Sequence, residues 1–475
     1  MQAALCSSPA APAAEPAHPF FPPQLLERLD KNGPRYTSYP TADRYHEGFG
    51  PAQYRRALEK RRESGTADPL SLYVHIPFCE SVCYYCACNK VVTRHHDRAV
   101  RYLDALSREI ALHVECLGTG TPVSQLHFGG GTPTFLSDEE LTRLMGGLRA
   151  AFRFEPDAEI SIEVDPRTTT PQRLAHLRRL GFNRLSFGVQ DFDEAVQAAV
   201  HRIQSFEDVS ALVRSARELD YASVNVDLIY GLPLQTAGSF ARTIAQVCEL
   251  RPDRIALYAY AHLPERFKPQ RRINVCDLPG RATRVGLLSA AIEGFLKEGY
   301  TYIGMDHFAL ATDALAIARQ RGELHRNFQG YSTQPDRDLV ALGVSAIGRI
   351  GDTYSQNDKT LDGYYAAIES GRYATVRGLE LNPDDLVRRE VIMEIMCQGR
   401  VEFADIEARH GLRFGDYFGP ELSQLARLAE LGLVNLRATG VQVTGLGWYF
   451  VRAVAMAFDG YLRAAGSGAS YSRII

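Results

Sequence analysis

Apolar strands and amphipathic helices alternate along the middle of the sequence, and this alternation limits the possible folds more than any other feature. Short apolar, β-branched runs predict six strands, at 71–76, 125–128, 159–164, 184–188, 223–228 and 254–258. Apolar residues at helical spacing predict helices at 99–117, 138–152, 171–180, 206–219 and 238–250. The alternation indicates right-handed βαβ units around a parallel sheet, so the fold class is α/β. Six units are fewer than a full barrel needs, so a partial (β/α)6 barrel and a doubly wound sheet both fit.

A dense cysteine cluster follows the first predicted strand. Cys79, Cys83, Cys86 and Cys88 fall close together, and the first three have the spacing C-x3-C-x2-C. Thiolates hold iron–sulfur clusters, normally four for a [4Fe–4S] cube. If only three bind, one iron stays open, as in catalytic rather than closed structural metal sites. The pattern predicts an iron–sulfur cluster at the carboxyl end of the first strand.

Two simpler interpretations of the cysteines compete with this one. A closed zinc site needs a second Cys or His pair, and no CxxC or HxxxH pair follows. Four unrelated thiols are the other alternative. The remaining cysteines stand singly, and apart from Cys6 we expect them to be small buried hydrophobic residues: Cys116, Cys248, Cys276 and Cys397. Nothing marks the chain as secreted, so a disulfide framework is not expected.

Polar and glycine residues follow several of the other predicted strands. Gly129–Thr134 follows the second strand, and its glycines allow a ligand to approach the backbone; it is not a P-loop, because no Gly-Lys-Ser/Thr follows. The third strand delivers Glu163 and Asp165 at its end, the fourth delivers Gln190 and Asp191, and the fifth delivers Asp227. Parallel strands end at one face, so these groups predict a shared site for an amine, a carboxylate and ribose hydroxyls.

The rest of the chain supplies the domain organisation. We expect a disordered Ala- and Pro-rich leader at 1–20, an arm and a helix at 21–70, a catalytic barrel at 71–370 and a substrate-covering C-terminal domain at 371–475. The last region predicts helices at 384–396, 420–431 and 448–464 and a hairpin at 434–444, a winged-helix-like pattern. The leader lacks the features of a signal peptide, and no run is long enough to span a bilayer. These features predict a cytoplasmic protein, and the absence of a coiled-coil seam favours a monomer.

Several motifs together resemble those of the radical S-adenosylmethionine superfamily and, within it, the oxygen-independent coproporphyrinogen III oxidase family. The superfamily resemblance rests on C-x3-C-x2-C, on 129–134 and on Glu163. The closer resemblance rests on the segments 34–40, 73–79, 86–90, 304–308 and 471–475. It covers the chain from about residue 20 to the end.

The resemblance implies a role for each matching residue. It implies that Cys79, Cys83 and Cys86 bind a [4Fe–4S] cluster, and that Tyr73, His75 and Cys88 are candidate catalytic residues; Cys88 belongs to the pattern without being an expected ligand. A first S-adenosylmethionine is expected beside Tyr73, Gly130, Glu163 and Ile347. A second S-adenosylmethionine is expected beside Tyr85, Gly131, Thr132, Gln190, Arg202, Asp227 and Ala261.

The activity that the resemblance implies is radical decarboxylation of coproporphyrinogen III. Two propionate side chains would become vinyl groups, giving protoporphyrinogen IX in haem biosynthesis, with an electron donor and an electron acceptor that the sequence does not identify. The substrate carries four carboxylates, so cationic groups should face the cavity; the candidates are Arg35, Arg266, Lys268, Arg271 and Arg272.

Two other functions compete with the oxidase. A haem chaperone of the same family shares the three-cysteine motif but lacks the Cys88 continuation and the 34–40 arm, and both are present here. A winged-helix nucleic-acid-binding protein would need a concentrated basic face. The net charge of −3 and the single cation, Arg437, in the predicted hairpin disfavour binding to nucleic acid.

Overall fold

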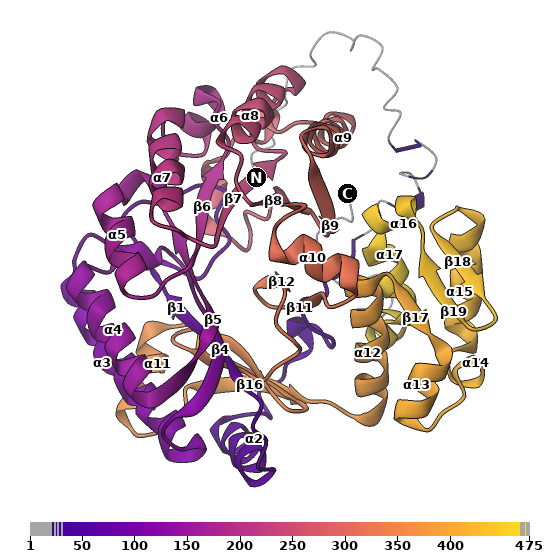
Figure 1. Ribbon diagram of the computed structural model, residues 1–475, viewed down its shortest axis with the longest axis horizontal. Coiled ribbons are helices and arrows are strands. Elements are labelled where there is room, and N and C mark those ends of the chain that lie inside the picture. Colours follow the sequence, from indigo (N-terminus) through magenta and orange to yellow (C-terminus); the bar gives the residue numbers. More distant parts are fainter. Residues whose placement is uncertain (1–20, 23–24, 26–27, 30–31, 466–470, 472–475) are drawn as a thin grey trace, which may run out of the picture.

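The computed structural model describes residues 21–22, 25, 28–29, 32–465 and 471. The predicted leader at 1–20 and residues 472–475 of the C-terminal motif lie outside this range. A twelve-stranded sheet forms the centre, in the order β16-β15-β14-β13-β1-β4-β5-β6-β7-β8-β10-β9. Helices line its outer side (Figure 1).

The six predicted strands are confirmed as neighbours in one parallel sheet. They are β1 (Leu70–Ile76), β4 (Thr121–Gly130), β5 (Phe152–Val164), β6 (Arg184–Gln190), β7 (Ser223–Tyr230) and β8 (Arg254–Ala259). Their spatial order follows the sequence without a switch point, so the sheet is a partial barrel and the doubly wound alternative is wrong.

Further strands extend the sheet at both edges. β13 (Leu339–Leu342) pairs in parallel with β1, and the sequence analysis did not find it. Antiparallel strands complete the edges: β14 (Ile347–Ile350), β15 (Thr353–Asn357) and β16 (Thr375–Glu380) beyond β13, and β9 (Tyr300–Gly304) and β10 (His307–Leu310) beyond β8. Two short pairs lie apart, β2 (Phe78–Cys79) with β3 (Val91–Val92) and β11 (His325–Asn327) with β12 (Gly330–Ser332).

The predicted helices begin and end close to their expected positions. They are α3 (Asp97–Leu117), α4 (Asp138–Ala151), α5 (Pro171–Arg179), α7 (Phe206–Glu218) and α8 (Ala237–Leu250). The helix expected within 21–70 is α2 (Pro51–Glu63), and α9 (Arg281–Lys297) follows β8. Two short helices were not predicted, α6 (Glu194–Ala199) and α10 (Ala314–Arg321), and α11 (Leu361–Glu369) follows β15. Local chemistry fixes the ends: Ser137 and Glu140 form a capping box that starts α4.

The C-terminal part is mostly helical. Its elements are α12 (Pro383–Gln398), β17 (Arg400–Glu402), α13 (Phe403–His410), α14 (Phe414–Tyr417), α15 (Gly419–Glu430) and the predicted hairpin of β18 (Val434–Arg437) and β19 (Gly440–Val443). The single helix predicted at 448–464 is wrong. The chain forms α16 (Gly445–Tyr449), α17 (Val451–Ala455) and α18 (Gly460–Ala465) instead. Asp459 accepts hydrogen bonds from the N–H groups of Tyr461 and Leu462 and so starts a new helix.

The N-terminal arm packs into the same hydrophobic core as the barrel and the C-terminal part. Tyr36 and Tyr39 are fully buried, and each makes a hydrogen bond near the start of α18: Tyr36 to the Asp459 carboxylate at 2.9 Å, and Gly460 N to the Tyr39 hydroxyl at 3.1 Å. The arm therefore bridges the first and last parts of the chain. None of the described helices is both long and apolar enough to span a membrane.

Candidate active site

A cavity of about 250 Å³ lies at the carboxyl ends of the parallel strands. It brings together most of the residues predicted from the sequence: Cys79, Cys83, Tyr85, Cys86, Cys88, Gly130, Gly131, Thr132, Glu163, Gln190, Arg202 and Asp227. Asp165, at the end of the third strand, lines it as well, together with residues that were not predicted: Lys90, Arg167, Ser186 and Tyr258. The shared position follows from the sheet, because each of these strands delivers its next loop to the same face.

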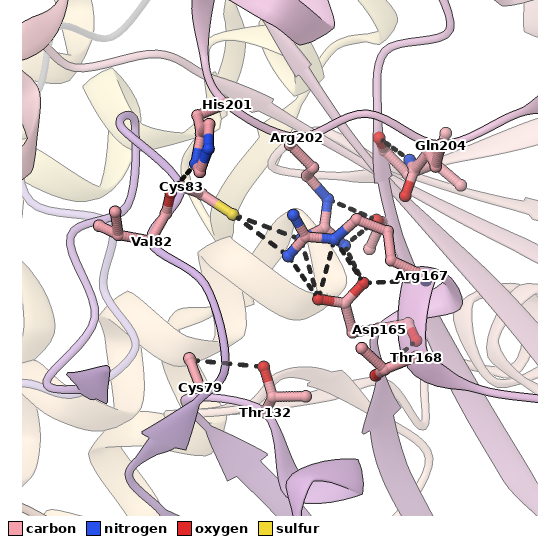
Figure 2. Close-up of polar contacts among 12 residues, drawn as sticks. Cys79, Val82, Cys83, Thr132, Asp165, Arg167, Thr168, His201, Arg202 and Gln204 are labelled. Carbon is pink, nitrogen blue, oxygen red and sulfur yellow. Dashed lines mark hydrogen bonds and ion pairs between the residues drawn. The ribbon is translucent and has the colours of Figure 1, made fainter. Parts of the chain in front are cut away.

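The cysteine loop is held by donors from three neighbouring segments. The Thr132 hydroxyl lies 3.4 Å from Cys79 Sγ, and Arg202 Nη1 and Arg167 Nη2 lie 3.5 and 3.6 Å from Cys83 Sγ (Figure 2). Lys90 Nζ donates to the Cys86 carbonyl at 3.2 Å. Positively charged donors around the sulfurs stabilise thiolates. The surroundings of the loop therefore favour cysteines in the thiolate form.

The thiols of the loop differ in acidity. A hydrogen bond between Cys86 and Cys88 lowers the pKa of Cys86 and raises that of Cys88. Burial raises the pKa of Cys79 to about 11, against the opposing effect of the Thr132 hydroxyl. Of Cys86 and Cys88, Cys86 is therefore the better thiolate ligand, whereas Cys88 remains a thiol on the cavity wall.

The cysteines do not form a site for a single metal ion. Within the described part of the chain, no three His, Cys, Asp or Glu side chains come close enough to hold one ion. Separate thiolates bind separate irons of a cube, so three cysteines spread around one cavity fit a cluster better than zinc.

Among the other cysteines, Cys116 and Cys397 are buried as expected; Cys248 is only half-buried and Cys276 is exposed, so the prediction is wrong for these two.

An ion network beside Cys83 was not predicted. The Asp165 carboxylate accepts from Arg167 Nε at 2.9 Å and Nη2 at 2.6 Å, and lies 3.3 Å from Arg202 Nη2 (Figure 2). All three side chains are largely buried. Burial alone would raise the pKa of Asp165, but the charges of Arg202 and Arg167 hold it below its ordinary value. The network keeps both guanidinium groups aimed at the sulfur. The Asp-Pro-Arg turn after the third strand is the signal that could have revealed it.

The glycines after β4 serve packing as well as access. A Cβ on Gly130, whose φ is +115°, would lie 2.6 Å from the His75 ring, and one on Gly131 would lie 2.6 Å from the Pro77 carbonyl oxygen. Gly130 N also donates to Glu163 at 3.1 Å. The backbone can pass this close to β1 only without side chains.

Four residues of the site that the family resemblance implies do not line this cavity. Tyr73 and His75 lie on β1, where the Tyr73 hydroxyl and His75 Nδ1 are 3.0 Å apart and His75 Nε2 donates to the Asn89 carbonyl at 3.0 Å. The Ala261 carbonyl accepts from the Gln270 amide, which also donates to the Tyr85 carbonyl. Ile347 begins β14, which is separated from β1 only by β13.

A second chamber of about 260 Å³ lies within the barrel. It shares Glu163, Ser186, Asp227 and Tyr258 with the first cavity, so the two adjoin. Burial, with a smaller effect from Glu163, raises the pKa of Asp227 to about 6.

The predicted carboxylate-binding cations fall into two groups. Arg35 lies in the interior, paired with Asp306 at 3.1 Å and placed over the Tyr258 ring. The others, Arg266, Lys268, Arg271 and Arg272, are exposed on the loop after β8, and none of them lines either chamber. The sequence of this basic run does not show whether its side chains face solvent or a cavity, which is why the prediction for these four residues is not supported by their positions.

Comparisons with known proteins agree with this geometry. Residues 73–247 match the model of the radical SAM superfamily, and residues 381–450 match the HemN C-terminal domain. The chain is therefore a member of the radical S-adenosylmethionine superfamily.

The relatives define the family more narrowly. The oxygen-independent coproporphyrinogen III oxidase of Escherichia coli is 49% identical over 95% of this chain and 98% of its own length. The enzyme of the same name from Pseudomonas aeruginosa is 50% identical over 92% of this chain and 95% of its own. A solved structure of the E. coli coproporphyrinogen III oxidase, described as a radical SAM enzyme, superimposes with a TM-score of 0.86 at 50% identity, covering 90% of this chain and 98% of that one. The chain belongs to the oxygen-independent coproporphyrinogen III oxidase family.

Proposed function

We propose that this chain catalyses the oxygen-independent oxidative decarboxylation of coproporphyrinogen III to protoporphyrinogen IX. One observation carries the proposal: the three cysteines of the C-x3-C-x2-C motif and the polar strand-end residues line one cavity. The near-complete match to relatives that bear the name of this activity supports it.

Cys79, Cys83 and Cys86 would bind a [4Fe–4S] cluster and leave one iron open. The arginines on Cys83 and the threonine hydroxyl on Cys79 fit this group, because hydrogen bonds to the sulfurs offset the charge of a thiolate-bound cluster. When bound, the reduced cluster and S-adenosylmethionine supply a 5′-deoxyadenosyl radical.

The protein's own residues would bind and orient the cofactor. The side chain of Glu163 is about two-fifths exposed, at 43%, although Gly130 N donates to one of its oxygens. Its other oxygen can accept from the cofactor's ammonium group. Tyr73 and Ile347 complete the site proposed from the family resemblance.

We further propose a second S-adenosylmethionine in the same cavity. Its proposed neighbours are Tyr85, Gly131, Thr132, Gln190, Arg202, Asp227 and Ala261. The Gln190 amide oxygen supports this, because it is buried and has no hydrogen-bond partner in the described structure. A buried acceptor without a partner is costly, and a donor on a ligand would satisfy it.

The net reaction at each propionate begins with removal of one hydrogen atom from the β-carbon. The C–C bond to the carboxylate then breaks, CO2 leaves, and one electron passes to a one-electron acceptor, so that a vinyl group remains. The chain must keep water from the reacting carbon. The arm containing Tyr36 and Tyr39, buried against the C-terminal part, is the proposed cover. We propose a cytoplasmic monomer that takes its electrons from a separate donor.

Anaerobic turnover tests the proposal. Reconstituted protein given a reductant, S-adenosylmethionine and coproporphyrinogen III should form 5′-deoxyadenosine and a divinyl product. Protein that binds haem tightly but cleaves no S-adenosylmethionine would instead be the haem chaperone. A Cys88→Ala variant serves as a second probe: it should keep its iron, because Cys88 is not a proposed ligand, and lose product formation.

A further inference from the structure

A buried arginine near the chambers, Arg326, forms no ion pair with any acid in the part of the chain that the structure describes. Arg326 lies on β11 and is only 5% exposed, yet its Nε and Nη1 have no hydrogen-bond partner in the described structure. Within the described residues its one hydrogen bond runs from Nη2 to the Arg35 carbonyl oxygen, at 3.3 Å. A buried charge is normally paired, because losing water is costly.

The surrounding charges do not neutralise it. Asp306, between β9 and β10, already pairs with Arg35, and Asp336, which lines the same small cavity as Arg326, pairs with Arg349 and Arg389. Arg337 adds a further cation; its Nη1 lies 3.9 Å from the exposed Asp68 carboxylate, while its Nε is buried without a hydrogen-bond partner among the described residues. Burial lowers the pKa of Arg326, and the charge of Arg35 adds to this effect. Asp306 and Asp336 are thus both paired with other arginines, and neither forms an ion pair with Arg326.

This guanidinium group borders one cavity directly and approaches a second one only through Tyr331. It lies over the Tyr331 ring at 4.7 Å, and Tyr331 lines the barrel chamber. Arg326 and Arg337 also line a cavity of about 20 Å³ with Thr37 of the arm. A space of roughly 10–15 Å³ on this measure holds one water, so this cavity has room for a single small group such as a carboxylate.

The position connects Arg326 to the proposed reaction. Arg35, whose carbonyl it binds, packs over Tyr258 at 5.4 Å, and Tyr258 lines both the cluster cavity and the barrel chamber. A planar guanidinium group with two free N–H donors matches a carboxylate.

We propose that Arg326, assisted by Arg337, binds a propionate carboxylate of the tetrapyrrole substrate and so sets specificity for it. The inference rests on the proposed function and assigns a recognition residue that neither the motifs nor the charge runs of the sequence reveal. A free small carboxylate could bind these donors in the same way as a propionate of the tetrapyrrole. The test therefore distinguishes a free carboxylate from a propionate of the substrate.

The test compares the binding of coproporphyrin III, which has four carboxylates, with that of its uncharged tetramethyl ester. Both are measured by fluorescence on the anaerobic, cluster-loaded chain. Arg326→Gln should weaken binding of the tetraacid about 10- to 100-fold, the range for loss of a hydrogen bond to a charged group, and leave ester binding unchanged. Arg326→Lys keeps the charge and should recover part of the affinity.

Arg178 offers a matched control. It also lies over a tyrosine ring and donates to a backbone carbonyl, but it is on α5 and lines neither chamber. Arg178→Gln should bind both porphyrins like the native chain, and iron content checks that each variant is folded.

Three results would overturn the inference. Arg326→Gln could bind the tetraacid as tightly as the native chain does, or lose acid and ester equally. Alternatively, millimolar acetate could bind only when Arg326 is present, while porphyrin affinity is the same in all variants; the site would then serve a free carboxylate. Absence of turnover by the native chain would refute the proposed function instead, and the binding comparison would still report on Arg326.

Discussion

The Asp165 network offers a sharp test of how the cysteine loop is held. Asp165→Asn removes one negative charge from a carboxylate that two buried arginines contact at 2.6 to 3.4 Å. The variant leaves Arg167 and Arg202 buried with no acid between them. Removing one partner of a buried ion pair costs about 3–5 kcal/mol, and the asparagine oxygen still accepts one hydrogen bond. We therefore expect a loss of about 3 kcal/mol in the free energy of unfolding.

The pH of the measurement follows from the lowered pKa of Asp165. Its stabilisation is fully present above the unfolded-state value of 3.8 and is lost as the pH falls through the lower folded-state value. Neutral pH therefore measures the whole contribution.

The assay is urea unfolding of the cluster-free chain, followed by circular dichroism. The double variant Asp165→Asn/Arg167→Gln is the control, because it removes one of the two uncompensated cations. It should be more stable than the single variant, which is the non-additivity expected of contacting charges. An unchanged midpoint for Asp165→Asn, or a double variant less stable than the single one, would refute the electrostatic account.

Three further variants test the packing of the fold and the proposed site. Gly343 has φ +98°, and a Cβ there would lie 2.3 Å from a buried tyrosine hydroxyl, so Gly343→Ala should lower the free energy of unfolding by more than about 3 kcal/mol in a thermal melt. The control is Gly65→Ala, which has φ +65° and open space and should lower it by only about 1–2 kcal/mol. Asp227, whose pKa is about 6, is protonated below that pH, so affinity for cationic S-adenosylmethionine should fall as the pH drops through about 6. Calorimetry should find weaker and nearly pH-independent binding for Asp227→Asn, and an unchanged pH profile in that variant would exclude this carboxylate. Cys79→Ser should lose iron on reconstitution while Cys116→Ser, buried on α3 away from the cavity, should keep about four irons per chain; equal iron in both would remove Cys79 from the ligand set.

The sequence predicted those parts of the fold that depend on local pattern. The six parallel strands and their helices followed from periodicity, and the cysteine loop was placed correctly because it follows a buried strand. β13 was missed because four apolar residues, Leu339–Leu342, show no period, and only pairing with β1 makes them a strand. The last helix was predicted too long because the Asp459 cap acts against an otherwise helical pattern.

The site was predictable where residues follow strands and not where contacts join distant segments. Glu163, Gln190 and Asp227 reached the cavity because their strands end there. Arg326 owes its position to side-chain packing across the fold, which no spacing encodes. The exposed cations after β8 show the same limit, because composition identified a basic run but could not orient it.

One isotope measurement tests the central claim most directly. Coproporphyrinogen III deuterated at the β-carbons of the propionates is supplied to the reduced, cluster-loaded chain without oxygen, and the 5′-deoxyadenosine is analysed by mass spectrometry. The account predicts 5′-deoxyadenosine one mass unit heavier, formed together with the divinyl product. Unlabelled 5′-deoxyadenosine accompanying the product, or product formed with no 5′-deoxyadenosine, would contradict it.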